Sequence, residues 1–248
     1  MIHRPFNIAH QGASGLYPSN TIAAFEGAVA AGADIIEIDV THTLDGVIVV
    51  SHDLHVDKCT DGHGFIPEMT LAEVKRLDAG VRFGAQFTGQ RIPTLDETLA
   101  WVEAKPIRLC IEVKGDTIGR YLRAGRGTVE MLQQRRFLHA VTLTSFSPQC
   151  IQAMKALEPR LSWGYDPDEI RKYTPWEVCE EALGCSANFL LYDHRRLSAD
   201  LVDEAHQHGF ALWAWTADDP QDLRRLIGMK VDAIMTNRPD VLQKIREE

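Results

Sequence analysis

The chain has 248 residues, of which 45% are hydrophobic and 25% are charged, as in an ordinary globular domain. Its formal net charge of -9 does not favour polyanions, so we expect no nucleic acid among its partners. The sequence shows no apolar segment of bilayer length, no signal peptide and no CxxC pair among its five cysteines, which predicts a cytoplasmic protein without stable membrane association.

Short apolar, β-rich segments alternate with helical segments along most of the chain. We expect strands at 6–10, 34–40, 107–113, 139–144, 161–165, 187–192, 210–215 and 231–236. We expect helices at 20–31, 117–135, 148–157, 175–183, 198–208, 218–227 and 239–247, with N-caps at Asn20, Ser198 and Asp218. This alternation predicts an α/β fold, a parallel sheet closed into a (β/α)₈ TIM barrel. A doubly wound open sheet is the alternative architecture.

The segment between the second and third of these strands breaks the alternation. It contains a short apolar run at 47–52, a glycine-rich turn at 61–64 and helical patterns near 70–78 and 94–104. We interpret it as an insertion at about 46–92, after the second barrel strand of a single domain that spans 1–248. Insertions in such connections lie over the active face of a barrel, so we expect this one to shape the substrate pocket.

Charged and imidazole side chains stand within or at the ends of several expected strands. Strand cores normally exclude such groups, because an unpaired buried charge is very costly. A shared site explains them together. They are His10, Glu37, Asp39, His52, Glu112 and Lys114.

Three of these groups are candidate metal ligands. Glu37 and Asp39 are two residues apart in one strand and therefore share a face, and Glu112 ends the next barrel strand. Three carboxylates suit one hard divalent cation, Mg²⁺ or Ca²⁺, and do not resemble a zinc site. The alternative is a structural network in which the carboxylates pair with Lys114 or an arginine. Lys114 serves either as that counter-charge or as a cation for a phosphoryl oxygen, and the two roles are compatible.

His10 and His52 are the candidates for proton transfer, because imidazole titrates near neutral pH. Either histidine alone would be interpreted as structural, but the neighbouring carboxylates favour a catalytic pair and phosphoester chemistry. Asp53 either orients His52 or caps the following turn. Trp213 and Trp215 are expected on opposite faces of one strand, with Trp215 lining a pocket or packing in the core.

Short motifs follow one another along the chain in a specific order and spacing. They are His10, Asn20-Thr21, Gly32-Ala33-Asp34, Glu37-Ile38-Asp39-Val40, Asp45-Gly46, His52-Asp53, Ile92-Pro93-Thr94-Leu95, Glu112-Val113-Lys114, Ser145-Phe146-Ser147, Trp215-Thr216 and Thr236-Asn237-Arg238-Pro239-Asp240. Over nearly the whole chain this series resembles the glycerophosphodiester phosphodiesterase family.

The resemblance implies a (β/α)₈ barrel with a small insertion. It also implies metal-dependent hydrolysis of a phosphodiester to an alcohol and a phosphomonoester, which is sn-glycerol 3-phosphate if the substrate is a glycerophosphodiester. The implied roles are acid–base catalysis for the two histidines, metal binding for the three carboxylates and phosphate contact for Lys114.

Two positions depart from the family pattern. Gln11 stands where the family usually has arginine, and Ser19 stands where it usually has glutamate. The arginine is expected to contact the phosphate. Gln11 still offers a hydrogen-bond donor, although a charge-assisted bond is about twice as strong as a neutral one. We therefore expect Gln11, Lys114 and Trp215 to contact the substrate.

These departures leave three alternatives open. The enzyme would cleave a sugar phosphodiester such as an agrocinopine-like opine, or it would be a lyase that releases a cyclic phosphate. The third alternative is a non-catalytic phosphodiester-binding protein. In each case the expected partner is a small-molecule phosphodiester, and the sequence allows a homo-oligomer without specifying one.

Overall fold

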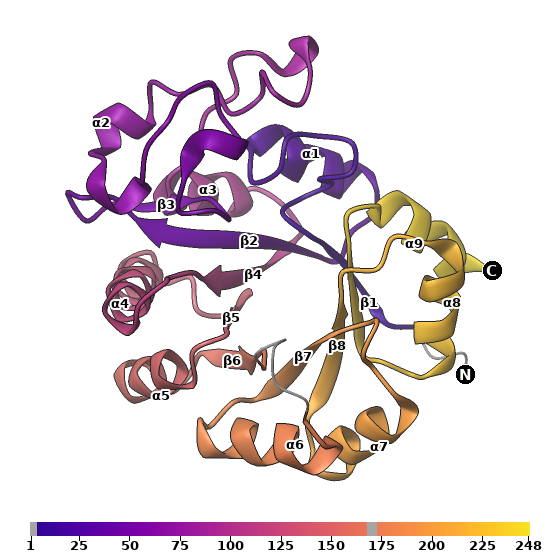
Figure 1. Ribbon diagram of the computed structural model, residues 1–248. Coiled ribbons are helices and arrows are strands. Elements are labelled where there is room, and N and C mark those ends of the chain that lie inside the picture. Colours follow the sequence, from indigo (N-terminus) through magenta and orange to yellow (C-terminus); the bar gives the residue numbers. More distant parts are fainter. Residues whose placement is uncertain (1–3, 168–172) are drawn as a thin grey trace.

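A closed barrel of parallel strands, surrounded by helices, forms the body of the protein (Figure 1). The computed structural model describes residues 4–167 and 173–248, so 1–3 and 168–172 of the expected domain lie outside the described residues. The barrel closes because β1 pairs in parallel with both β2 and β9, which confirms the predicted (β/α)₈ fold. The barrel strands are β1 (Phe6–Ala9), β2 (Ile35–His42), β4 (Arg108–Val113), β5 (Val141–Ser145), β6 (Ser162–Tyr165), β7 (Phe189–Asp193), β8 (Ala211–Trp215) and β9 (Ala233–Thr236).

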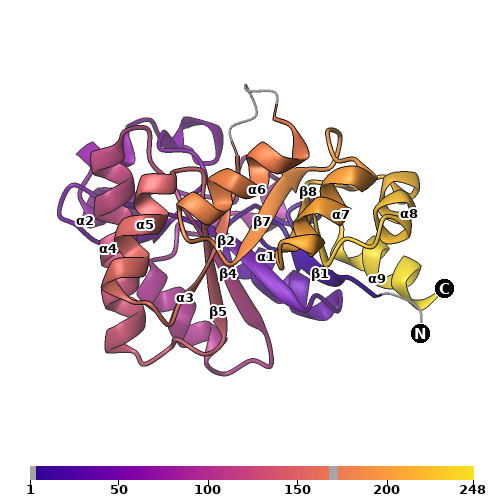
Figure 2. The ribbon, with the colours of Figure 1, turned by 90° about the horizontal axis from the view of Figure 1, so that it is seen from below.

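Helices connect successive barrel strands and cover the outside of the barrel (Figures 1 and 2). Within the described ranges, no helix is both long and apolar enough to cross a membrane. The covering helices are α1 (Ile22–Ala30), α3 (Leu95–Val102), α4 (Ile118–Gln134), α5 (Pro148–Leu157), α6 (Pro175–Gly184), α7 (Ala199–Gln207), α8 (Pro220–Gly228) and α9 (Pro239–Glu247).

One expected helix cap is confirmed and two are wrong. Ser198 caps α7 as predicted, because its side chain accepts a hydrogen bond from the Leu201 N–H. Helix α1 is capped by Thr21, one residue after the expected Asn20, whose side chain bonds Asp39 instead. In the same way, α8 is capped by Asp219. The neighbouring Asp218 accepts hydrogen bonds from the turn that follows β9.

Side chains alternate along each strand between the barrel interior and the outer layer under the helices. Trp213 and Trp215 both belong to the interior, which corrects the expectation that they face opposite sides, because residues two apart in a strand share a face. Gly164 leaves room for this interior, since a Cβ there would lie 2.4 Å from the Phe189 ring. The interior residues are Ile8, Ile35, Cys110, Phe189, Leu191, Trp213, Ala233 and Met235, with Ala211 and Trp215 packed against them.

The segment between β2 and α3 forms a small structure of its own at one side of the barrel. Its strand β3 (Ile48–Val50) pairs antiparallel with β2, and its short helix α2 is Leu71–Val74. In both ribbon views α2 and α9 lie on opposite sides of the molecule (Figures 1 and 2). The segment packs around an apolar cluster separate from the barrel, formed by Val49, Val56, Ile66, Val74, Ala79 and Ile92.

The layer between strands and helices provides a test of what holds the barrel together. Ile111 of β4 is completely buried in this layer, so we expect Ile111→Ala to lower the free energy of unfolding by about 2–5 kcal/mol. The matched control is Ile118→Ala at the exposed start of α4, which should change it by less than about 0.5 kcal/mol. Urea unfolding followed by circular dichroism measures both values. Equal losses would contradict this packing.

Candidate active site

The predicted site residues meet at one end of the barrel, where the parallel strands finish. Glu37 and Asp39 lie on β2, and Glu112 lies opposite Asp39 on β4. His10 directly follows β1, and Lys114 directly follows β4. His52 reaches the same end from the residues after β3.

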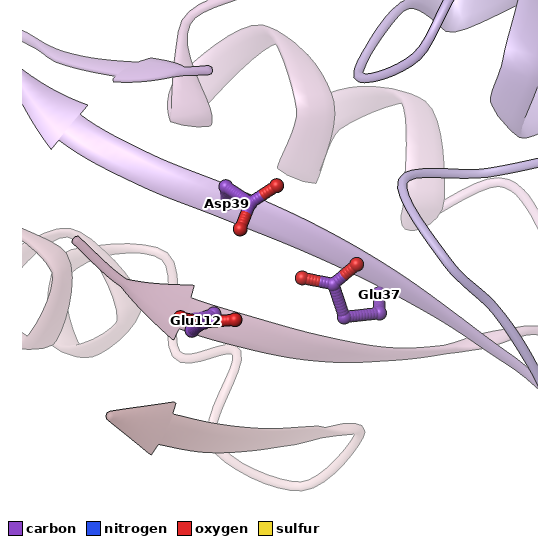
Figure 3. Close-up of side chains that lie close together, drawn as sticks. All are labelled: Glu37, Asp39 and Glu112. Carbon is purple, nitrogen blue, oxygen red and sulfur yellow. The ribbon is translucent and has the colours of Figure 1, made fainter. Parts of the chain in front are cut away.

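The three carboxylates converge. One oxygen from each of Glu37, Asp39 and Glu112 lies within 4.8 Å of the others, in the space between β2 and β4 (Figure 3). Glu37 and Asp39 are fully buried, and Glu37 Oε1 accepts no hydrogen bond from the residues that the structure describes. Each of the three carboxylates has one buried oxygen without a hydrogen bond among the described residues, and such a convergent set of hard oxygens fits a divalent cation such as Mg²⁺ or Ca²⁺.

The loop between β1 and α1 holds two of these carboxylates in place. The backbone N–H of Gln11 donates to Glu37 Oε2 over 2.9 Å, and Asn20 Nδ2 donates to Asp39 Oδ2 over 2.8 Å. Gln11 and Asn20 both adopt left-handed backbone conformations, with φ of 56° and 58°. Such conformations are uncommon outside glycine and persist where the surrounding structure fixes them.

Lys114 is the counter-charge within the cluster. Its Nζ lies 2.5 Å from Glu112 Oε1 and 3.2 Å from Asp39 Oδ1. Burial alone would lower the pKa of Lys114, but the adjacent Glu112 and Asp39 carboxylates outweigh it and raise the pKa. The ammonium therefore stays charged at neutral pH and offsets part of the repulsion among the carboxylates.

The carboxyl groups differ in their affinity for protons. Burial, reinforced by the charges of Asp39 and Glu112, raises the pKa of Glu37 well above its usual value. Burial also raises the pKa of Glu112, against the opposing effect of Lys114. For Asp39, Lys114 and the two histidines overcome the effect of burial, so its pKa is lowered. In the absence of a cation, Glu37 is the carboxyl group that most favours protonation.

The two histidines have different surroundings. Burial lowers the pKa of His10 despite the opposing charge of Asp39, so its imidazole is neutral near pH 7. Its Nδ1 lies 2.8 Å from Asn237 Oδ1. The His52 side chain is half exposed, and its Nδ1 lies 3.1 Å from the Asp53 carboxylate. The Asp53 carboxylate is thus close enough to orient His52, and its other oxygen lies 3.5 Å from Lys58 Nζ.

A cavity of about 350 Å³ opens beside the two histidines. Gln11 and Ser19, the two departures from the family pattern, line it together with Lys58 from the segment after β2. Trp215 is not among its lining residues; its ring instead meets Phe146 at 6.2 Å, and the same Phe146 ring lies 5.5 Å from Lys114 Nζ. A second cavity, of about 520 Å³, lies where the strands begin and contains none of the predicted site residues.

Sequence reasoning missed the roles of two asparagines that orient the site. Asn20 binds both the side chain and the backbone N–H of Asp39, and Asn237 binds His10. Asn20 belongs to the Asn-Thr motif at the start of α1, and Asn237 directly follows the barrel strand β9. That position at the carboxyl end of a strand was the available signal.

Comparisons with known proteins agree with this geometry. Residues 10–241 match the model of the glycerophosphoryl diester phosphodiesterase family. The chain is 37% identical over 237 residues to a glycerophosphodiester phosphodiesterase of Caldanaerobacter subterraneus subsp. tengcongensis, covering 95% of each chain. A Bacillus subtilis glycerophosphodiester phosphodiesterase is 30% identical over 259 residues, covering 98% of this chain and 87% of the relative.

A solved structure is also similar. It is an Oleispira antarctica phosphodiesterase in complex with the product sn-glycerol-3-phosphate, with a TM-score of 0.91 and 29% sequence identity. The similarity covers 99% of this chain and 98% of that one. The agreement therefore extends over both the barrel and the segment after β2.

The carboxylate cluster leads to a test of cation binding. A ligand that binds only the folded state at 100 times its Kd adds about 2.7 kcal/mol of stability, so saturating Mg²⁺ or Ca²⁺ should raise the unfolding midpoint by about 5–10 °C. Asp39→Asn should abolish this rise. The matched control is Asp96→Asn, which removes an exposed carboxylate paired with Arg135 and should show the same cation-induced rise as the native protein. Differential scanning calorimetry measures the midpoints, and an unchanged rise in Asp39→Asn would refute the site.

The raised pKa of Glu37 leads to a second test. Its pKa is higher in the folded protein than in the unfolded chain, so stability from this group is lost as pH rises through the folded value. In cation-free buffer we expect Glu37→Gln to be more stable than the native protein at about pH 8, and similar to it at about pH 4. The matched control is Glu103→Gln, an exposed substitution outside the cluster that should change stability by less than about 0.5 kcal/mol. Thermal midpoints measure these differences in stability. A Glu37→Gln variant less stable than the native protein at both pH values would contradict the raised pKa of Glu37.

Proposed function

The chain belongs to the glycerophosphoryl diester phosphodiesterase family, and we propose that it hydrolyses glycerophosphodiesters to an alcohol and sn-glycerol 3-phosphate. The observation that carries this proposal is the convergence of Glu37, Asp39 and Glu112 at the barrel end that also bears His10 and His52. The similar Oleispira antarctica enzyme, with its bound product, supports the same substrate class.

The alternatives from the sequence are less well supported. Relatives that match along almost the whole chain are named as phosphodiesterases of glycerophosphodiesters. These names favour neither a sugar phosphodiester, nor a lyase, nor a protein without catalysis. The substrate is accordingly a small molecule. A cytoplasmic location is supported by five cysteines that are all free thiols.

We propose that Glu37, Asp39 and Glu112 hold one divalent cation, either Mg²⁺ or Ca²⁺. When bound, the cation supplies a Lewis acid that offsets negative charge on the phosphodiester. The chain contributes the hard-oxygen cluster, the Gln11 and Asn20 hydrogen bonds that fix two of the carboxylates, and the burial of Glu37 and Asp39. The buried Glu37 Oε1 without a hydrogen-bond partner among the described residues supports this assignment.

The different surroundings of the histidines support different roles. His10 is neutral near pH 7 and takes the proton of the attacking water as its oxygen bonds to phosphorus. His52, beside the Asp53 carboxylate, donates a proton to the alcohol oxygen as the bond between that oxygen and phosphorus breaks. Each turnover leaves His10 protonated and His52 neutral, and exchange with solvent restores both.

Three further residues are proposed to contact the substrate. Lys114 lies between two carboxylates and adds a fixed positive charge for a phosphoryl oxygen. Gln11 faces the cavity and offers a neutral hydrogen-bond donor. Trp215 stands at the end of β8 and packs against Phe146, whose ring also lies 5.5 Å from Lys114 Nζ.

The proposed function is tested by turnover. With glycerophosphocholine or glycerophosphoethanolamine as substrate and Mg²⁺ or Ca²⁺ present, we expect release of sn-glycerol 3-phosphate that EDTA abolishes. His10→Ala and His52→Ala should each lower kcat by about 10²–10⁴-fold, the usual contribution of general acid–base catalysis.

The matched control is His206→Ala, which removes a surface histidine paired with Asp232. It should retain kcat within about twofold, as expected for a residue outside the site. An enzyme-coupled assay for sn-glycerol 3-phosphate measures all four proteins. Near-native turnover in either site variant would show that the substituted histidine is not needed for catalysis. A cyclic phosphate product would show that the enzyme is a lyase and not a hydrolase.

A further inference from the structure

We infer that Asn237, held in one orientation by Asp218, sets the tautomer of His10 so that Nε2 carries the free lone pair. Asn237 and Asp218 are thereby positioning residues that act through His10. The inference rests on the proposed function only in one respect, namely that this lone pair takes the proton of the attacking water. The orientation itself follows from hydrogen-bond geometry.

The three residues come from adjacent parts of the barrel rim. His10 follows β1, Asn237 follows β9 and Asp218 lies in the loop between β8 and α8. Asn237 Oδ1 lies 2.8 Å from His10 Nδ1, and Asn237 Nδ2 donates to Asp218 Oδ2 over 2.7 Å. The Asn237 amide thus bridges the imidazole and the carboxylate.

The carboxylate is itself held by its second oxygen. Asp218 Oδ1 accepts from the backbone N–H of Asn237 over 2.7 Å and from the Thr236 hydroxyl over 2.8 Å. Asp218 is therefore fixed by three hydrogen bonds from two consecutive residues. This use of the side chain explains why Asp219, the next residue, caps α8.

The orientation of the Asn237 amide follows from these partners. A carboxylate oxygen is only an acceptor, so the amide must present its NH₂ group to Asp218 and its oxygen to His10. The opposite orientation would place two acceptors against each other and lose the bond to Asp218. The Ser14 hydroxyl lies 2.7 Å from both Asn237 Oδ1 and the His10 carbonyl oxygen, and it donates its single hydrogen to one of these two acceptors at a time.

The tautomer of His10 follows in turn. Facing an amide oxygen, Nδ1 must carry the hydrogen, and neutral imidazole then has its lone pair on Nε2. Among the described residues, Asn237 is the one hydrogen-bond partner of the His10 ring. The charges of Asp39, Lys114 and His52 also influence the pKa of His10, after the larger effect of burial.

A single substitution should invert this arrangement. In Asp218→Asn, the new amide keeps its oxygen toward the backbone N–H of Asn237 and turns its NH₂ group to the Asn237 side chain. Asn237 must then present its oxygen to residue 218 and its NH₂ group to His10 Nδ1. His10 Nδ1 becomes the acceptor, and the hydrogen moves to Nε2.

A second substitution should restore it. In the double variant Asp218→Asn with Asn237→Asp, the carboxylate at 237 accepts from the amide at 218 and from His10 Nδ1–H. The same pair of side chains is present in exchanged positions. Loss in the single variant with recovery in the double one separates tautomer control from general disruption of the rim.

Nitrogen-15 NMR of the histidine-labelled resting enzyme reads the tautomer without substrate. The His10 signals are assigned by their absence in His10→Asn. We expect Nδ1–H in the native and double variants and Nε2–H in Asp218→Asn. An Asp218→Asn spectrum in which His10 keeps the native tautomer would overturn the inference.

Kinetics test the consequence separately. At the pH optimum of each protein, Asp218→Asn should lower kcat by about 10²-fold or more with KM changed less than about threefold, and the double variant should recover most of this loss. Asp240→Asn, in the first turn of α9 and paired with Arg238, is the matched control and should keep native kcat. An inverted tautomer with unchanged kcat would support the inference and would contradict the role of His10 in the proposed function.

Discussion

The electrostatic repulsion among three carboxylates buried at one end of a barrel is the constraint on which the rest of the site depends. Bringing Glu37, Asp39 and Glu112 together without compensation would be costly, because each charge loses its hydration and faces two like charges. The protein distributes the compensation. Lys114 supplies charge, the β1–α1 loop supplies hydrogen bonds, and Glu37 has a raised affinity for protons.

Several departures from ordinary local structure follow from this constraint. Gln11 and Asn20 adopt left-handed backbone conformations because the loop has to deliver hydrogen bonds to Glu37 and Asp39. Asn20 is thereby unavailable as a helix cap, and Thr21 replaces it. Local sequence rules fail here because a tertiary requirement competes with them, as is common at functional sites.

The barrel and its site differed in how far the sequence could predict them. The alternation of apolar strands and helices predicted the closed sheet, because that pattern follows from burial on both faces. The two-residue spacing of Glu37 and Asp39 predicted a shared face by strand geometry alone. Contacts such as His10 with Asn237 join opposite ends of the chain, and no local pattern encodes which amide meets which imidazole. The shared face of Trp213 and Trp215 was predictable from the same two-residue rule.

The Gln11 hydrogen bond to Glu37 has a consequence for substitutions at position 11. Because the donor is the backbone N–H, the bond to Glu37 does not use the functional group of the side chain at position 11. That side chain lines the cavity, so its chemistry can change the cavity wall without disturbing the bond to Glu37. An exchange of arginine for glutamine at this position therefore leaves the hydrogen bond to Glu37, and with it the carboxylate cluster, unaltered.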